Sequence, residues 1–180
     1  MLQLANARLR AGFFDRCLTP PPWRRLSSLL SRESSRLFFA LNRQTPAPRK
    51  PALIVGYGNT LRGDDAVGPQ LATMLGGIAV QQLVPELAER IATEDRVIFI
   101  DARTDLAPGD VQVMPVESDS ASTHWCSPGW LLHLAQEVYG KSPEAILIGI
   151  GAESFDLGAP PSAAAQQGIK KALAQIRAMR

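Results

Sequence analysis

The sequence predicts an α/β fold of three layers, in which a mostly parallel sheet carries helices on both faces. From residue 52 onward, short apolar runs alternate with segments whose apolar residues recur at helical spacing. The runs at 97–100 and 146–150 are apolar throughout, as expected of strands that are covered on both faces. Together these patterns predict a sheet built from strand and helix alternations.

Each expected element has its own local signal. After the first strand comes a glycine-rich turn, and Val67, Leu71 and Leu75 then mark a helix that tolerates Pro69 only in its first turn. Pro85 opens a helix and Gly140 stops another. The expected strands are residues 52–55, 78–83, 96–100, 110–116 and 145–150. The expected helices are the one that follows the glycine-rich turn and residues 85–91, 128–139 and 162–179.

The charge of the chain is unevenly distributed. Residues 1–50 contain ten Lys and Arg against Asp15 and Glu33, a net charge of +8, whereas the remainder has a net charge of −6. The first fifty residues are also rich in Arg, Ser and Pro, so we expect a basic, disordered N-terminal extension, with a docking arm or an organelle presequence as alternatives. Residues 51–180 are expected to form one catalytic α/β domain. Because the basic excess belongs to the extension, nothing assigns nucleic-acid binding to the folded part.

Composition also bears on the compartment. The apolar runs fall far short of the roughly 20 residues that span a bilayer, so no transmembrane helix and no membrane partner is expected. Cys17 and Cys126 lie far apart and fit neither a disulfide framework nor a paired-thiol metal site. We therefore expect a reducing compartment, the cytoplasm. The protein is also expected to be a monomer.

Two acidic positions follow predicted strands, where ligands bind in open α/β sheets. Asp64 and Asp65 end the glycine-rich turn, and Asp101 follows the third strand directly. Asp64 is best interpreted as a cap of the helix that follows it. Asp65 can either share that role or point across the sheet edge to a cation. Asp101 can be a turn former or a ligand.

The two histidines differ in their surroundings. His124 lies in a polar stretch before a helix and is either a surface residue or a ligand, whereas His133 lies among leucines inside that helix and is expected to pack. Asp65, Asp101 and His124 would form an open site of oxygen and nitrogen ligands, suited to nickel or zinc. Their spread over about sixty positions forms no compact motif, so spacing alone does not establish the site.

Other catalytic templates fit less well. The sequence contains no Gly-x-Ser-x-Gly elbow, and nothing around Cys126 marks an activated thiol. The glycine-rich turn lacks the Lys-Ser/Thr ending of a P-loop, and the strand at 78–83 ends without an acid for a ribose. A nucleotide-binding α/β module is therefore a poorly supported alternative.

Residues 56–68 (GYGNTLRGDDAVG) resemble the opening signature of the hydrogenase maturation proteases, in which a strand, a Gly-x-Gly-Asn turn and an acidic pair precede Gly-Val-Gly. The resemblance continues to the C terminus and covers about residues 52–180, but none of the first fifty. The further matches are QLVPELA at 82–88, VIFIDA at 97–102, Thr123-His124 with Ser127-Pro128, Leu131-Leu132, and ESFDLG at 153–158.

The resemblance implies a twisted sheet sandwiched between helices and one activity, a single cut near the C terminus of a nickel-iron hydrogenase large-subunit precursor. It places the metal-binding and catalytic residues on Asp65, Asp101 and His124. Nickel already installed in the precursor is then the recognition element, and a water polarised by the ion or by a ligating carboxylate is the nucleophile. The alternative is a non-catalytic, metal-dependent checkpoint or chaperone that binds the precursor without cutting it.

Three positions depart from the family pattern. Ala66 stands where glycine is usual, Gln81-Gln82 replaces His-Gln, and residues 159–162 (APPS) differ from the usual Leu-Ser entry to the last helix. None of them belongs to the triad, so we expect them to affect substrate choice and loop shape rather than activity.

Overall fold

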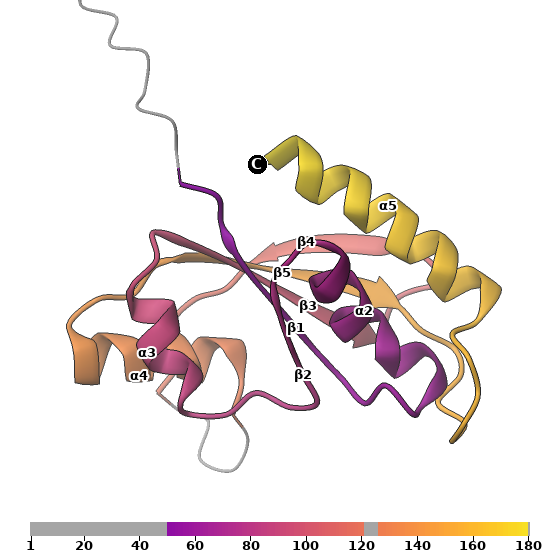
Figure 1. The fold of residues 1–180 in the computed structure, drawn as a ribbon, viewed down its shortest axis with the longest axis horizontal. Helices are drawn as coiled ribbons and strands as arrows, with labels where there is room; N and C mark the ends of the chain where they lie inside the picture. The colour runs from indigo at the N-terminus through magenta and orange to yellow at the C-terminus, as the bar shows by residue number, and fades with distance from the viewer. Residues whose placement is uncertain (1–49, 121–125, 180) are drawn as a thin grey trace, which may run out of the picture. The chain divides into compact units, whose positions relative to one another are not determined.

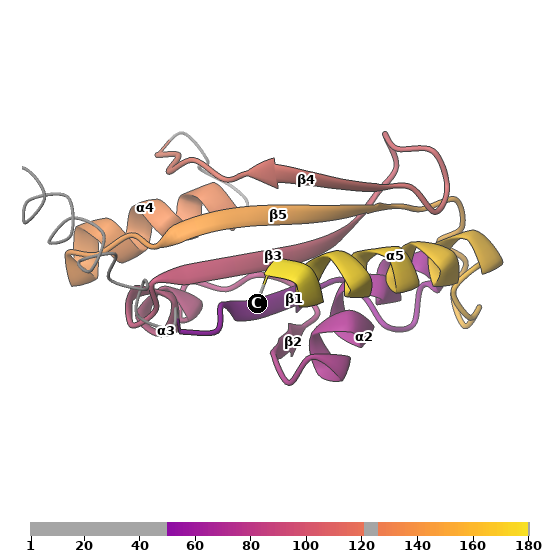
Figure 2. The same ribbon diagram turned by 90° about the horizontal axis from the view of Figure 1, so that it is seen from above.

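The computed structural model describes residues 50–120 and 126–179, which form an α/β unit around a five-stranded sheet. Across the sheet the strand order is β2-β1-β3-β5-β4, which Figure 2 shows with β4 at the top and β2 at the bottom. β2, β1, β3 and β5 run parallel to one another, and β4 pairs with β5 in the antiparallel sense. The strands are β1 (Leu53–Tyr57), β2 (Ile78–Val80), β3 (Arg96–Arg103), β4 (Val111–Pro115) and β5 (Glu144–Gly151).

Helices cover both faces of this sheet, so the predicted α/β architecture is confirmed. In Figure 1, α3 and α4 lie on one side of the strands and α2 and α5 on the other. The helical elements are η1 (Gly63–Ala66), α2 (Val67–Met74), α3 (Leu87–Ala92), α4 (Pro128–Tyr139) and α5 (Ala163–Met179). The expected extension at residues 1–50 lies, except for Lys50, outside the described residues and stays a prediction.

Two apolar cores result from the alternation of side chains along the strands. Ile54 of β1 and Ile98 of β3 are buried against α2 and α5. The neighbouring positions Val55 and Phe99 are buried against α3 and α4. Strands buried on both faces need apolar residues at successive positions, which explains the uninterrupted runs in the sequence.

All five strands differ from the predicted ranges by at least one residue, and β2 and β3 differ most, by three residues at their carboxyl ends. β2 ends at Val80 rather than residue 83, where the Gly58 N–H donates to the carbonyls of both Val80 and Gln81 at 3.2 Å and pairing with β1 stops. β3 continues to Arg103 instead of ending at residue 100, because it stays in register with β5 along its whole length. Asp101 therefore lies within β3, near its carboxyl end, and does not follow the strand as predicted.

Helix α4 has the predicted bounds because both its ends carry strong local signals. The Ser127 hydroxyl accepts a hydrogen bond from the Trp130 N–H at 3.1 Å, and Pro128 occupies the first turn. Gly140 ends the helix with a φ of 73°, a left-handed conformation that glycine adopts without strain. Among the helices of the described residues, none is long and apolar enough to cross a membrane.

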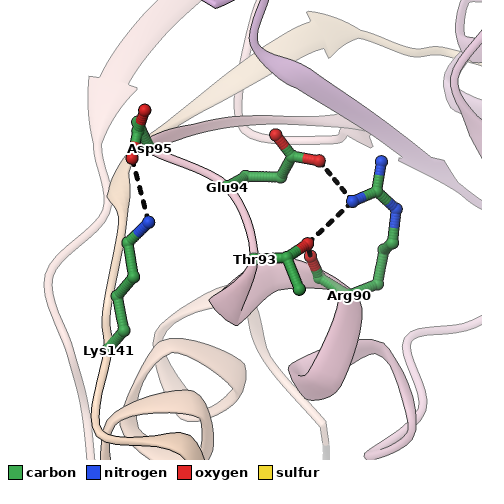
Figure 3. A network of polar contacts seen from close by, with 5 residues as sticks. All are labelled: Arg90, Thr93, Glu94, Asp95 and Lys141. Carbon is green, nitrogen blue, oxygen red and sulfur yellow. Dashed lines mark hydrogen bonds and ion pairs between the residues drawn. The ribbon is translucent and has the colours of Figure 1, made fainter.

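A charged network lies where α3 ends and β3 begins (Figure 3). Arg90 pairs with Glu94 and donates to the Thr93 hydroxyl at 2.8 Å, while Lys141 donates to Asp95 at 2.9 Å. The hydrogen bond and charge of Lys141 lower the pKa of Asp95. Exposed pairs of this kind add little to stability. The network belongs to the amino end of β3, whereas the acidic candidates lie towards the opposite end.

Candidate functional site

The start of α2 lies unusually close to the carboxyl ends of β1 and β3, and two glycines make this possible. A Cβ on Gly56 would lie 2.0 Å from the Gly68 carbonyl oxygen. A Cβ on Gly68 would lie 2.4 Å from the Tyr57 carbonyl oxygen and 2.6 Å from that of Ile100. No side chain fits at these distances, so the first and last glycines of the 56–68 motif are required by packing.

The turn between β1 and η1 fixes Asp65. The Asn59 N–H donates to Oδ2 of Asp65 at 2.7 Å, and the Asn59 side-chain oxygen accepts from the Leu61 N–H at 2.9 Å. Gly58 has a φ of 138°, and a Cβ there would lie 2.0 Å from the Asp65 carbonyl oxygen. The Gly-x-Gly-Asn turn therefore holds the Asp65 carboxylate at the strand end.

Asp101 lies beside a residue of the neighbouring strand. Gly56 of β1 pairs with Ile100 of β3, so the next residues along, Tyr57 and Asp101, are neighbours on adjacent strands. Both point to the side of α3 and α4, because they continue the alternation that buries Val55 and Phe99 there. The Tyr57 hydroxyl and the Ala102 N–H lie close enough to the Asp101 carboxylate to lower its pKa.

The surroundings of Asp101 change its acidity. Burial raises the pKa of Asp101 to about 6, although the hydrogen bonds from Tyr57 and Ala102 act in the opposite direction. The negative charge of Asp65 raises this pKa further, and the positive charge of Arg103 lowers it. Burial, followed by the charge of Asp101, raises the pKa of Tyr57, so its hydroxyl keeps its proton and acts as a donor.

Asp65 and Asp101 share a pocket of about 510 Å³. It lies beside the carboxyl ends of β1 and β3, where the segments leading into α3 and α4 form the rest of its wall. Its size suits a peptide side chain or a short peptide segment. The pocket is lined by Tyr57, Gly58, Asp65, Asp101, Cys126 and the five residues Gln81, Gln82, Leu83, Val84 and Pro85.

Asp64 has a different role from its neighbour. Its side chain is fully buried, and it accepts hydrogen bonds from the N–H groups of Glu153 (2.9 Å), Ser154 (3.1 Å) and Ser162 (2.5 Å) and from the Ser162 hydroxyl (3.0 Å). Burial alone would raise the pKa of Asp64, but these hydrogen bonds outweigh burial and the pKa is lowered. Asp64 thus stabilises the segment that leads into α5. The sequence instead predicts that Asp64 caps the helix that directly follows Asp64 and Asp65.

The last matching motif, residues 153–158, lies against the first one. The Asp64 N–H donates to the Ser154 carbonyl at 2.8 Å, and the Gly158 N–H donates to the Leu61 carbonyl at 2.7 Å. Arg62 forms an isolated antiparallel bridge with Leu157. Two segments about ninety residues apart in the sequence therefore form one rigid support for the turn that carries Asp65.

The structure brings together two of the three predicted ligands. Asp65 and Asp101 line one pocket and interact electrostatically. His124 lies outside the described residues, and within those ranges no three His, Cys, Asp or Glu side chains form a group that could hold a metal ion. The two carboxylates repel each other, which a bound cation would relieve, but oxygen ligands alone suit hard divalent cations. A borderline metal such as nickel would need a nitrogen ligand as well, and the predicted one is His124.

Cys126 and His133 were not expected to take part in the site, and they lie in different surroundings. Cys126 lines the pocket, but burial and the nearby charge of Glu86 raise its pKa, which favours the unreactive thiol. His133 is partly buried within α4. Tyr57 was missed by the sequence reasoning, although the alternation of Leu53, Val55 and Tyr57 already places it on the side of the sheet that α3 and α4 cover.

Comparisons with known proteins agree with the family resemblance. No protein-family model and no curated protein matches the sequence. Among solved structures, the [NiFe] hydrogenase maturation protease HybD from Thermococcus kodakarensis is 26% identical, with a TM-score of 0.57 over 72% of this chain and 99% of its own. The hydrogenase maturating endopeptidase HybD from E. coli is 25% identical, with a TM-score of 0.55 over 72% of this chain and 91% of its own. HycI from T. kodakarensis, at 22% identity and a TM-score of 0.59, shares the fold. The resemblance to the hydrogenase maturation protease family is confirmed.

Proposed function

From the fold and motifs that this chain shares with the hydrogenase maturation proteases, we propose that it is an endopeptidase that removes a C-terminal extension from a nickel-iron hydrogenase large-subunit precursor. The observation that carries the proposal is the pocket at the carboxyl ends of β1 and β3, where Asp65 and Asp101 meet. The opening motif at 56–68 contributes Asp65 to this pocket, the motif at 97–102 contributes Asp101, and the motif at 82–88 contributes four further lining residues.

The arrangement supports hydrolysis by a water molecule. Asp101 has a pKa of about 6, so near neutral pH it is largely ionised and remains basic enough to accept a proton. Asp65 is held by the Asn59 N–H and carries a second negative charge into the same pocket. Two fixed carboxylates can orient a water beside a peptide carbonyl, and no covalent intermediate is needed.

We further propose that nickel in the precursor is the recognition element, bound by Asp65, Asp101 and His124. Carboxylate and imidazole groups suit nickel, and three protein ligands leave coordination positions for the groups that the precursor supplies. The nickel belongs to the substrate, and it would provide Lewis acidity beside the peptide bond to be cut. Burial raises the pKa of Asp101 and so disfavours its ionised form. A cation bound beside the carboxylate would favour the ionised form again.

Site variants test the catalytic role. Asp65→Ala, Asp101→Ala and His124→Ala should each reduce processing of the nickel-loaded precursor by at least about 100-fold, because loss of one ligand disrupts the position of the others. The matched controls are His133→Ala and Cys126→Ser, which should retain most of the activity. Circular dichroism establishes that each variant is folded. Wild-type cleavage by folded Asp65→Ala, or loss of cleavage in Cys126→Ser, would contradict the assignment.

Nickel dependence is tested separately. Nickel-loaded and nickel-free precursors are incubated with the enzyme in matched reactions, and the shortened subunit is quantified by gel electrophoresis. Only the nickel-loaded precursor should be cut, and nickel added to the enzyme alone should not restore the reaction. Equal cleavage of both precursors would remove nickel from the proposal, while binding of the loaded precursor without any cut would favour a non-catalytic checkpoint.

A further inference from the structure

We propose that the outer edge of β2 pairs with an extended segment of the hydrogenase precursor beside the bond to be cut, an inference that rests on the proposed peptidase function. β2 forms one edge of the sheet and β4 the other (Figure 2). Within residues 50–120 and 126–179, β2 pairs with β1 alone. Extended peptides bind to many proteins by adding a strand to such an edge, through main-chain hydrogen bonds.

The register of β2 determines which of its backbone groups point outward. The Val80 carbonyl accepts from the Gly58 N–H at 3.2 Å, so it points towards β1. The N–H and C=O of a planar trans peptide point in opposite directions, so the Gln81 N–H points away from β1. Successive residues of a strand alternate, so the N–H and C=O of Ala79 also point away, as does the Gly77 carbonyl.

These four outward groups form a row that matches the main chain of an extended peptide. In order they are the Gly77 carbonyl, the Ala79 N–H, the Ala79 carbonyl and the Gln81 N–H. None of them takes part in a hydrogen bond within the part of the chain that the structure describes. Ala79 is exposed, and its methyl group is too small to keep another backbone away. The row therefore offers two donors and two acceptors to a further strand.

The two edges of the sheet differ in their protection against pairing. β4 contains Pro115, and proline is one of the residues that keep edge strands from pairing. β2 has the sequence Ile-Ala-Val, with neither a proline nor a charged residue. Its three residues limit any pairing to a short stretch, which suits a substrate that must be released after the cut.

The position of the pocket indicates why the partner is the peptide to be cut. β2 leads directly into residues 81–85, which line the pocket together with Asp65 and Asp101. Gln81, whose N–H ends the outward row, belongs to the pocket wall. A peptide paired along β2 therefore reaches the pocket with its backbone already extended and held, which orients the bond to be cut.

Ala79→Pro tests the proposal because it removes an outward N–H and leaves the hydrogen bonds from β2 to β1 in place. Proline is tolerated in an edge strand where its N–H would face outward. Val113→Pro is the matched control at the β4 edge. The Val116 N–H donates to the Ala145 carbonyl of β5 at 2.9 Å, so by alternation the Val113 N–H points outward. Circular dichroism establishes that both variants are folded.

With nickel-loaded precursor, Ala79→Pro should lower kcat/KM about tenfold, mainly through KM, because the proline removes one hydrogen bond and hinders the others. Val113→Pro should stay within about twofold of wild type. A wild-type kcat/KM in folded Ala79→Pro, or equal losses in the two proline variants, would overturn the strand addition alone. A wild-type enzyme that never cuts the precursor would instead overturn the proposed function.

A second measurement does not depend on the cut. A synthetic peptide that copies the precursor sequence around the cut is added to wild type, and amide hydrogen exchange is followed by NMR. Exchange of the Ala79 and Gln81 N–H groups should slow at least about fivefold, while that of Val113 stays unchanged. Unchanged exchange at Ala79 would overturn the proposal. So would protection already present in the free protein, or protection that rises with protein concentration, since another part of this chain or a second copy would then cover the edge.

Discussion

Replacement of Asp64 by alanine should strongly destabilise the α/β unit without touching the pocket. Asp64 is fully buried and joins η1 to the residues before α5 through four hydrogen bonds. Asp64→Ala removes both acceptor oxygens, and with them all four hydrogen bonds, so that three backbone N–H groups and one hydroxyl must be hydrated instead. Asp64→Asn keeps the shape but places an amide N–H₂ against at least one donor.

The expected size follows from these contacts. A hydrogen bond to a charged group contributes about 1.5–3 kcal/mol, and the four are not additive because they share one carboxylate and the loop can be partly rehydrated. We expect Asp64→Ala to lower the free energy of unfolding by about 4 kcal/mol and Asp64→Asn by about 2 kcal/mol. A loss of this size is a large part of the stability of an ordinary domain.

The pH dependence of this effect has a definite sign. The pKa of Asp64 is lowered in the folded state, so its stabilisation is present above the unfolded value of 3.8 and is lost as pH falls through the folded pKa. Urea denaturation followed by circular dichroism measures the free energies at pH 7 and below pH 4. Asp156→Ala, which removes an exposed carboxylate from the same loop, is the control and should change stability by less than about 0.5 kcal/mol. An Asp64→Ala variant as stable as this control would refute the reasoning.

Two further substitutions test the packing and the electrostatics of the strand ends. Asp101→Asn should raise the free energy of unfolding at pH 7 by about 1–3 kcal/mol. The raised pKa of Asp101 means that its protonated form stabilises the fold fully below pH 3.8, and this stabilisation is lost as pH rises through about 6. Urea denaturation at pH 4 and pH 7 measures the effect of the substitution, and an equal effect at both pH values would contradict the argument. Gly56→Ala should destabilise by about 3 kcal/mol or more, because its Cβ would meet the Gly68 carbonyl. Gly76→Ala is the control, because a Cβ at Gly76 would have no atom within 4 Å and only the strain of a φ of 70° remains, about 1–2 kcal/mol. Thermal unfolding of both variants measures the losses, and equal losses would refute the packing argument.

Local signals in the sequence were sufficient where a segment carries its own boundaries. Ser127, Pro128 and Gly140 define both ends of α4, and the helix has the predicted bounds. The apolar runs of β3 and β5 identify strands but not their ends, because pairing can continue into polar residues. Thus β3 includes Asp101, which the sequence placed after the strand.

Contacts between distant segments could not be predicted in the same way. Asp64 looked like a cap of its own helix, since its partners Glu153 and Ser162 are about ninety residues away along the chain. The pairing of Tyr57 with Asp101 depends on the register between β1 and β3, which no local pattern gives. The position of Asp65 and Asp101 at one edge was predictable, because the carboxyl ends of parallel strands meet there.

The proposed activity is a single cut near the C terminus of a hydrogenase large-subunit precursor, made at the pocket that Asp65 and Asp101 line. Intact mass spectrometry of nickel-loaded precursor, recorded before and after incubation with wild type and with folded Asp65→Ala, tests it most directly. Wild type should convert the precursor to one shortened species and release one C-terminal fragment of complementary mass, while Asp65→Ala should leave the precursor intact. An unchanged precursor mass after incubation with wild type, or the same fragment from Asp65→Ala, would contradict the claim.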